Sequence, residues 1–330
     1  GGREPGAGLR AAPRPPPLGA GEGAGWGLDG LGGATGGAAL SSAARAELAE
    51  GGVFAVDKPR GVTSAWVVER VLETAQAALG AAGAKVGHGG TLDPEATGVL
   101  IIGINSGTRM LEGFLSGPKT YDAEVTMGVE TDTQDAAGRV VAEAGYGAVE
   151  REALEALLPQ FTGTIQQVPP MYSALKLKGK PMYELARDGV EVERPARDVE
   201  VHRLELLEFA PPTFTLTVEC GKGLYVRTLG TDLARAAGSM GHVSALRRTR
   251  AGDFGLGQCL AVAQVSDAAE IAARLQRRPL PPGPSGRERW LARRRRRCPT
   301  ERATGRRRGS ARGGPPQLPG LGRLPHARAS

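Results

Sequence analysis

The stretch GHGGTLDPEATGVLIIGI, residues 87–104, changes from a glycine-rich segment to an apolar run. Its first twelve positions hold four glycines and one proline, which predicts a loop, and the apolar run 99–104 predicts a strand after it. Asp93 lies inside this loop. The glycines before it allow the backbone to approach a ligand closely, and Pro94 restricts the direction in which the chain leaves. The pattern therefore predicts a carboxylate held on a rigid turn between apolar segments.

Two interpretations of this loop remain open from the residues alone. An Asp that precedes a Pro often caps the segment after it, whereas Asp93 on a glycine-rich turn could equally be catalytic or bind a ligand. His88, at the loop entry, could likewise be structural or functional. The glycines do not form a phosphate loop, because the GxxxxGK[ST] order is missing and no helix is expected directly after them.

Strands and helices are expected on both sides of the loop. Before it, residues 53–56 predict a strand that ends at Pro59 and Gly61, and a helix capped by Thr63 or Ser64 is expected to run to Leu79. The later part predicts helices over 106–115, 149–158, 225–237 and 263–275, a polar turn over 131–138, and strands over 119–128, 199–209, 214–219 and 243–249. The strands 199–209 and 214–219 should pair as a hairpin. Because no regular strand–helix–strand period occurs, the pattern predicts an α+β fold.

Composition divides the chain into three parts. Residues 1–50 hold 14 of the 50 glycines, and residues 281–330 hold 8 glycines and 8 of the 24 prolines. We therefore expect a low-complexity, disordered segment over 1–50, one folded domain over 51–275, and a disordered Arg/Pro/Gly-rich tail over 276–330.

The basic character of the protein is concentrated in the tail. Residues 281–330 carry 14 Arg and 2 acidic residues, a net charge of +12, which leaves −5 on the other 280 residues. A folded body that is basic all over, as in many nucleic-acid-binding proteins, is therefore excluded, whereas local basic patches are not.

Several site classes and locations are disfavoured by the sequence. Cys220, Cys259 and Cys298 lie far apart without metal-ligand spacing, so no metal site is expected, and an odd cysteine count suits a reducing compartment. No apolar run of about 18 residues predicts a membrane span. Residues 1–50 contain no secretory apolar region, and their 4 Arg against 5 acidic residues argue against an organellar transit peptide.

A second group of chemistry-bearing residues lies in CGKGLYVRT, residues 220–228, where a strand ends and a helix begins. Arg227 falls in the first helical turn, where the helix dipole disfavours a cation, so an anionic partner would explain it. That partner could be Asp93 or a nucleic-acid phosphate. The structural alternative is an exposed Arg227 paired with Asp232.

Three further features carry both a structural and a functional interpretation. Tyr121 opens a predicted strand and could be packed in the core or stack on a planar ligand. The basic run 176–180 and the cluster Arg247, Arg248 and Arg250 could be solvated faces or could contact phosphates.

Taken together, six stretches that follow one another over residues 51–265 resemble the TruB family of tRNA pseudouridine synthases. They are GVFAVDKPRGVTS (52–64), GHGGTLDPEATGVL (87–100), KTYDAEVTMGVETDTQDAAG (119–138), VPPMYSALKLKGKPMYELARDG (168–189), CGKGLYVRTLGTDL (220–233) and HVSALRRTRAGDF (242–254). Neither end of the chain is covered by the resemblance.

The resemblance implies an α+β pseudouridine synthase fold, with a mixed, curved β-sheet, flanking helices and an insertion that grips RNA. It implies an isomerase that converts one uridine, at position 55 in the T-loop of tRNA, to pseudouridine, without cofactor or metal. The enzyme breaks the glycosidic bond and rejoins base and sugar through carbon. Possible substrates include mRNA with a similar stem-loop, and a monomer is expected.

The resemblance also assigns roles to individual residues. Asp93 corresponds to the nucleophile, Arg227 pairs with it, and Tyr121 stacks on the target base and is placed to move a proton. The residues expected to bind substrate are His88, which helps to hold the flipped-out RNA loop, Leu246, which lines the uracil pocket, and Tyr225.

The chemistry leaves the exact part played by the carboxylate open. It could attack the ribose or the ring, or assist loss of a ribose proton. Because a stacked base is out of reach, the uridine must be flipped out, and stacking on Tyr121 would offset about 1–3 kcal/mol of that cost.

Two alternative functions are weighed against this one. A guide-RNA-dependent pseudouridine synthase would need a folded C-terminal RNA-binding domain, which residues 276–330 cannot form. A protein that only binds or folds RNA would be expected to lack part of the active site. Family members work in the bacterial cytoplasm, the nucleus, the cytosol and mitochondria, so the resemblance predicts an intracellular protein and leaves the compartment open. The Arg-rich tail could add RNA affinity through phosphates.

Overall fold

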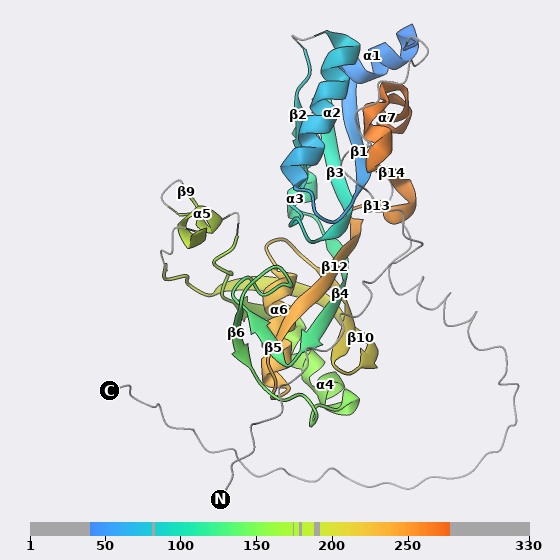
Figure 1. Cartoon of the computed structure of the whole chain (residues 1–330). Coiled ribbons are helices and arrows are strands. Elements are labelled where there is room, and N and C mark those ends of the chain that lie inside the picture. Colours follow the sequence, from blue (N-terminus) through green and yellow to red (C-terminus); the bar gives the residue numbers. More distant parts are fainter. Residues whose placement is uncertain (1–39, 81–82, 174, 178–179, 188–191, 278–330) are drawn as a thin grey trace, which may run out of the picture. The chain divides into compact units, whose positions relative to one another are not determined.

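The computed structural model describes residues 40–80, 83–173, 175–177, 180–187 and 192–277 (Figure 1). The main element is a ten-stranded sheet with the strand order β14-β1-β3-β12-β4-β11-β10-β7, to which β2 and β13 add at β3 and β12. Its strands are β1 (Gly51–Lys58), β2 (Val86–His88), β3 (Thr97–Asn105), β4 (Lys119–Met127), β7 (Gly163–Gln167), β10 (Arg197–Ala210), β11 (Thr213–Cys220), β12 (Gly241–Ala251), β13 (Phe254–Gly255) and β14 (Cys259–Ala261). The pairs β1–β14 and β12–β3 are parallel and the rest antiparallel, so the predicted mixed sheet is confirmed.

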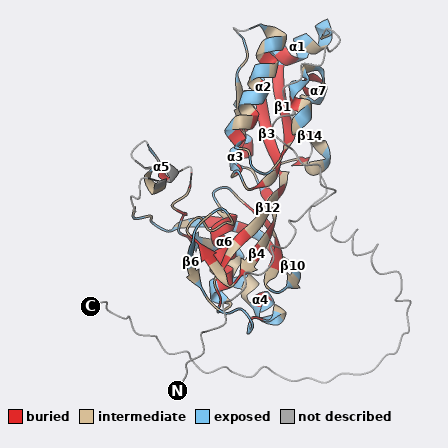
Figure 2. Cartoon of the chain, in the orientation of Figure 1, coloured by how far each residue is buried: buried red, intermediate tan, exposed pale blue. Residues whose placement is uncertain are grey.

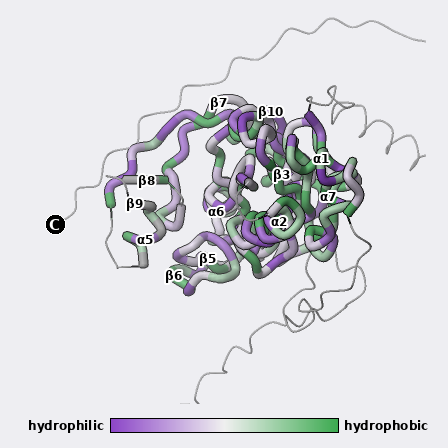
Figure 3. Tube along the Cα trace, turned by 90° about the horizontal axis from the view of Figure 1, so that it is seen from above, coloured by the Kyte–Doolittle hydropathy of each residue, from purple (hydrophilic) through white to green (hydrophobic). Residues whose placement is uncertain are grey.

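Helices pack on this sheet or connect its strands. They are α1 (Ser42–Glu50), α2 (Ser64–Leu79), α3 (Leu111–Ser116), α4 (Arg151–Leu157), α5 (Met182–Arg187), α6 (Val226–Ala236) and α7 (Ala268–Arg274). Two small sheets lie outside the main one: β5 (Val129–Thr131) with β6 (Val140–Glu143), and β8 (Lys176–Leu177) with β9 (Lys180–Pro181). The connection from β7 to β10 carries β8, β9 and α5 beside the main sheet, as Figures 1 and 3 both show. Among the described helices, none is long and apolar enough to cross a membrane.

Two large apolar clusters share the sheet. One joins β4, β10, β11 and β12 to α4 and α6, and the other joins β1 and β3 to α1, α2 and α7. Figure 2 shows the buried strands in both halves. Tyr121 on β4 and Leu246 on β12 pack against both clusters. These two side chains therefore mark the line along which the halves of the sheet meet.

The predicted helix from Ser64 to Leu79 is confirmed, and local chemistry explains its start. The Thr63 hydroxyl accepts a hydrogen bond from the Trp66 N–H, and the buried residues Val67, Val71 and Ala75 recur at helical spacing. The hairpin of β10 and β11 is also present.

The single helix predicted over 263–275 is two separate elements in the structure. Residues Val262–Ser266 form a 3₁₀ turn, and α7 begins only after Asp267. The Asp267 carboxylate accepts hydrogen bonds from the N–H groups of Ala269 and Glu270, so the cap starts a separate helix there. Residues 106–115 are divided in the same way, into a 3₁₀ turn Ser106–Met110 followed by α3.

The described body extends beyond the range 51–275 expected for the folded domain, from α1 at one end to Gln276 at the other. The segment expected to be disordered to residue 50 contains α1, because Ser41 caps a run of good helix formers and Leu48 is fully buried. At the other end, Gln276 forms two backbone hydrogen bonds of 2.8 Å with Val53 and so belongs to the body. Residues 1–39 and 278–330, including the Arg-rich tail, lie outside the described residues.

We expect Leu48→Ala to lower the free energy of unfolding by about 3 kcal/mol, because the truncation leaves a cavity between α1 and the cluster formed with α2 and α7. Denaturant unfolding measures this loss. Arg45→Ala, on the exposed face of α1, is the control and should stay within about 0.5 kcal/mol of wild type. Equal effects of the two substitutions would show that α1 does not pack on the body.

Candidate active site

Asp93 lies on the loop between β2 and β3, as the glycine-rich pattern predicts. The turn after it is closed by the Asp93 backbone carbonyl, which accepts from the Ala96 N–H at 3.1 Å. The carboxylate itself pairs with Arg227, whose Nε lies 2.9 Å from Asp93 Oδ2. The Asp93 side chain is 40% exposed. The carboxylate is therefore held by Arg227 and is still accessible to a substrate.

Three side chains from elsewhere in the chain hold the backbone of this loop. Lys58, which is fully buried at the end of β1, donates to the carbonyls of Pro59 and Val62, both at 2.8 Å, and of Pro94 at 3.1 Å. Burial lowers the pKa of Lys58 to about 8, although the charge of Asp93 opposes this shift. The loop is thus fastened directly after the catalytic candidate.

Ser64, at the start of α2, holds the residue before Asp93. Its hydroxyl donates to the Leu92 carbonyl at 2.9 Å and accepts from the Leu92 N–H at 2.8 Å. The same serine begins α2, so the helix and the loop are aligned by one buried hydroxyl.

Arg248 on β12 holds the beginning of the loop. Its side chain is buried, and the guanidinium donates to Val99 O at 2.6 Å, Gly90 O at 3.1 Å and Thr91 O at 3.4 Å. Gly98 allows β3 to come this close to β12: its φ is +102°, and a Cβ there would lie 2.2 Å from the Arg248 carbonyl oxygen.

Arg227 connects the Asp93 loop to two other segments. It lies in the first turn of α6, its side chain is 6% exposed, and it donates to Thr133 O at 2.5 Å and Tyr172 O at 2.8 Å. Its Nη1 also lies 3.7 Å from Asp135 Oδ2. The predicted anionic partner is confirmed as Asp93, and the alternative pair with Asp232 is wrong, because Asp232 pairs with Arg235.

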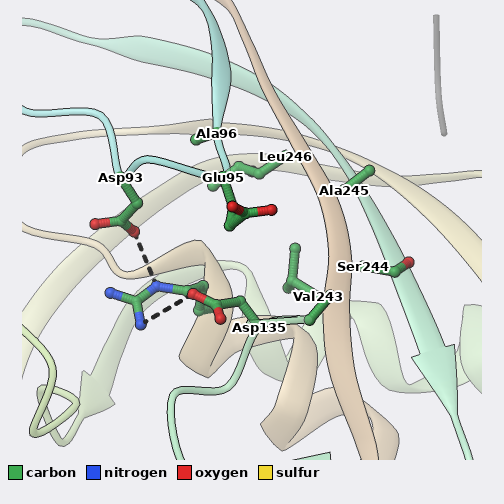
Figure 4. A pocket seen from close by; sticks show the side chains of 10 residues that line it. Asp93, Glu95, Ala96, Asp135, Val243, Ser244, Ala245 and Leu246 are labelled. Carbon is green, nitrogen blue, oxygen red and sulfur yellow. Dashed lines mark ion pairs between the residues drawn. The ribbon is translucent and has the colours of Figure 1, made fainter. Parts of the chain in front are cut away.

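These groups surround a pocket that encloses about 280 Å³ outside the protein atoms, open solvent included (Figure 4). It is lined by Asp93, Glu95, Ala96, Asp135, Ala136, Arg227, Val243, Ser244, Ala245 and Leu246. In Figure 4 the carboxylates of Asp93, Glu95 and Asp135 converge from two sides, with apolar β12 side chains opposite. The pocket thus combines one buried cation, three carboxylates and an apolar wall that suits a planar ring.

Tyr121 lies on β4 beside Arg248 of β12 and packs at the junction that Leu246 also occupies. Burial raises the pKa of Tyr121. The positive charge of Arg248 lowers this pKa, and the negative charge of Asp93 raises it, but burial has the largest effect. The Tyr121 phenol therefore keeps its proton at neutral pH and can donate it. Of the predicted substrate residues, Leu246 lines the pocket itself.

Comparisons with known proteins agree with this geometry. The family model described as "TruB family pseudouridylate synthase (N terminal domain)" matches residues 77–226, and that of the "tRNA pseudouridylate synthase B C-terminal domain" matches residues 227–281. The tRNA pseudouridine synthase B of Bordetella pertussis is 46% identical over 216 residues, which cover 65% of this chain and 86% of that protein. The chain belongs to the TruB family.

Two further relatives extend the comparison of this TruB family member. "Pseudouridylate synthase TRUB1" of Mus musculus is 47% identical over 218 residues, which cover 63% of this chain and 64% of that protein. Among solved structures, the "Crystal Structure of a Cbf5-Nop10-Gar1 Complex" matches with a TM-score of 0.50 and 28% identity, over 68% of this chain and 56% of that one. The predicted pseudouridine synthase fold and isomerase class are confirmed.

Three other predicted site residues of this TruB family protein, Tyr121, His88 and Tyr225, are not among the residues that line the pocket. His88 on β2 accepts a hydrogen bond from the Gly90 N–H at 3.4 Å, and burial lowers its pKa. Tyr225 precedes α6, with the Arg197 guanidinium over its ring at 5.4 Å. The buried Gln167 amide donates to Tyr225 O at 3.1 Å and accepts from Tyr225 N at 2.8 Å. The roles of His88 and Tyr225 in substrate binding remain predictions.

For the cluster Arg247, Arg248 and Arg250, the sequence left a solvated face or a phosphate contact open, and neither describes Arg248. Arg248 is buried against backbone carbonyls, and Arg247 pairs with Asp57 at 2.7 Å. Arg248 therefore cannot contribute to a phosphate-binding face, whereas the Arg247 side chain is 30% exposed, and a phosphate contact of Arg247 or Arg250 stays a prediction. In the run 176–180, Lys178 lies outside the described residues and Lys180 is exposed.

Asp135, Lys58 and Glu95 were missed by the sequence analysis. Asp135 lies in the segment 131–138, whose polar composition signals a turn and nothing more. For Lys58 a signal existed, because a Lys that follows the apolar run 53–56 closely, at the end of the same strand, is a candidate for burial. Within the described residues, no group of three or more His, Cys, Asp or Glu could hold a metal ion.

We expect Arg248→Lys to slow pseudouridine formation at least about tenfold at saturating RNA, with little change in KM. One ammonium cannot replace a planar guanidinium that reaches three carbonyls, so the Asp93 loop loses its anchor while the buried charge remains. Single-turnover rates at several RNA concentrations measure the effect. Arg250→Lys is the control, because Arg250 donates to the Gly252 carbonyl rather than to the Asp93 loop, and an equal loss in both variants would contradict the positioning role.

Proposed function

We propose that the protein converts uridine 55 in the T-loop of tRNA to pseudouridine. The observation that carries this proposal is the ion pair of Asp93 and Arg227 in a pocket whose apolar wall includes Leu246. Family membership supports the reaction class, and the curated relatives are named for tRNA. In the same proposal the protein acts as a monomer inside the cell, in the nucleus, cytoplasm or mitochondrion. It also accepts mRNA stem-loops that present a uridine in the same way.

The pocket can take only a base that has left the RNA stack, so flipping must precede chemistry. Leu246 and Tyr121 lie together where the two apolar clusters meet, and their faces would receive the uracil ring. Stacking of that kind contributes about 1–3 kcal/mol for each base and offsets part of the unstacking cost. His88, Tyr225 and the connection from β7 to β10 would hold the surrounding RNA.

Asp93 would then act at the sugar. Arg227 holds Oδ2, whereas Oδ1 has no hydrogen-bond partner among the described residues and is free to meet the substrate. In the isomerisation the bond from ribose C1′ to N1 breaks, a bond from C1′ to C5 forms, C5 loses its proton and N1 gains one. The carboxylate can add to the ribose or the ring, or take a ribose proton. Each route ends in this exchange and needs neither oxidant nor metal.

We expect Asp93→Asn to abolish pseudouridine formation while tRNA affinity stays within a few-fold of wild type, because the amide keeps the shape and loses the reactive carboxylate. The assay uses an unmodified tRNA transcript without any guide RNA, and position 55 is read by chemical mapping. Turnover above a few percent in this variant would remove Asp93 from the reaction. Wild-type activity that requires an added guide RNA would instead favour the guide-dependent alternative.

Tyr121→Phe should keep RNA affinity and strongly slow the chemical step, because the ring remains and the proton donor does not. Its rate is compared with wild type under single-turnover conditions. The matched control is Tyr146→Phe, which removes a tyrosine hydroxyl from the segment after β6. A rate like wild type in Tyr121→Phe would leave this residue with stacking alone.

A further inference from the structure

A second ion pair, of Arg60 with Glu95, lies at the pocket beside the pair of Asp93 and Arg227. Arg60, in the turn after β1, places its Nε and Nη2 each 2.6 Å from Glu95 Oε2. The two side chains are 43% and 34% exposed. The neighbouring Gly61 N–H donates to Pro94 O at 2.9 Å, which holds the Arg60 turn beside the Asp93 loop. Arg60 is therefore a solvent-accessible cation kept next to the pocket.

The charges of the pocket lining show why a cation is needed there. Three carboxylates line it, those of Asp93, Glu95 and Asp135, against the single cation of Arg227. Asp93 and Asp135 share Arg227, Glu95 pairs with Arg60, and the buried Lys58 interacts with Asp93 and Glu95 through its charge. RNA carries a negative charge on every phosphate, so an unpaired Glu95 at the mouth would repel the nucleotide that must enter.

The geometry of the pair leaves Arg60 able to bind a second anion. Both of its contacts go to one oxygen of Glu95, and Nη1 has no partner among the described residues. A guanidinium presents five donors in a planar fork that matches the oxygens of a phosphate. The Glu95 charge keeps this fork beside the pocket and competes with a phosphate for the same donors.

We propose that Arg60 binds a backbone phosphate next to the flipped uridine and that Glu95 holds Arg60 over the pocket mouth until RNA arrives. The site takes an RNA phosphodiester. Glu95 lines the pocket together with Asp93, and Arg60 is paired with it, so a nucleotide whose sugar reaches Asp93 would carry its phosphate within one sugar of this pair. This inference rests on the proposed function and assigns a substrate contact to residues outside the catalytic pair.

The proposal predicts opposite effects for the two partners, whereas a purely structural ion pair predicts the same effect for both. Arg60→Ala removes the phosphate contact and exposes the Glu95 charge, so it should weaken RNA binding about threefold to tenfold. The slope of log K against the logarithm of the salt concentration should become shallower by the contribution of about one phosphate contact. Glu95→Gln removes a repulsive charge and frees Arg60, so it should tighten binding about twofold or more with an unchanged slope.

Affinity is measured with an unmodified tRNA transcript in the Asp93→Asn background, so that the RNA is not converted during the titration. Arg151→Ala and Glu155→Gln are the matched controls, because this pair on α4 has similar exposure, 39% and 49%, and a contact of 2.9 Å. Both controls should stay close to the background affinity.

The proposal is overturned if Arg60→Ala changes affinity no more than Arg151→Ala, or if Glu95→Gln weakens binding as Arg60→Ala does. Pseudouridine formation at position 55 is measured separately with the protein that keeps Asp93. Failure at position 55 would reject the proposed function, whereas the signs of the Arg60 and Glu95 effects test the phosphate contact alone.

Discussion

The guanidinium of Arg227 joins three segments that are far apart in the sequence. It pairs with Asp93 between β2 and β3, donates to Thr133 after β5, and donates to Tyr172 after β7. Such a buried cation is costly unless acceptors surround it, so the three segments must be in place together. The pocket exists where they meet, and the position of the catalytic candidate thus depends on this side chain.

Buried cations recur around the same loop with backbone carbonyls as acceptors. Lys58 and Arg248 each reach three carbonyl oxygens, and neither has a carboxylate within ion-pair distance in the described part of the chain. Carbonyl dipoles keep the loop fixed while leaving the negative charge of Asp93 for Arg227 and the substrate. Rigidity of this kind is what positioning catalysis requires, because an error of about 1 Å costs roughly a hundredfold in rate.

The junction of the two apolar clusters supplies the other half of the site. Tyr121 and Leu246 are packed against both clusters, so their faces are held in place by apolar contacts from both sides. The polar residues of the loops and the apolar residues of the sheet therefore meet at the pocket. The partly exposed Arg60 and Glu95 continue the charged side of the pocket to the protein surface, where RNA would bind.

The sequence by itself determined the elements that local chemistry controls. The glycine-rich turn at Asp93, the cap and apolar spacing of α2 and the hairpin of β10 and β11 follow from neighbouring residues, and the dipole argument at Arg227 required an anion. Only the tertiary structure decided which anion, because Asp93 and Arg227 are distant along the chain and meet through the order of strands. The same reason explains why Arg248 lies inside, why Asp135 and Glu95 reach the pocket, and why α1 belongs to the body: burial depends on what packs against a residue, which local pattern does not contain.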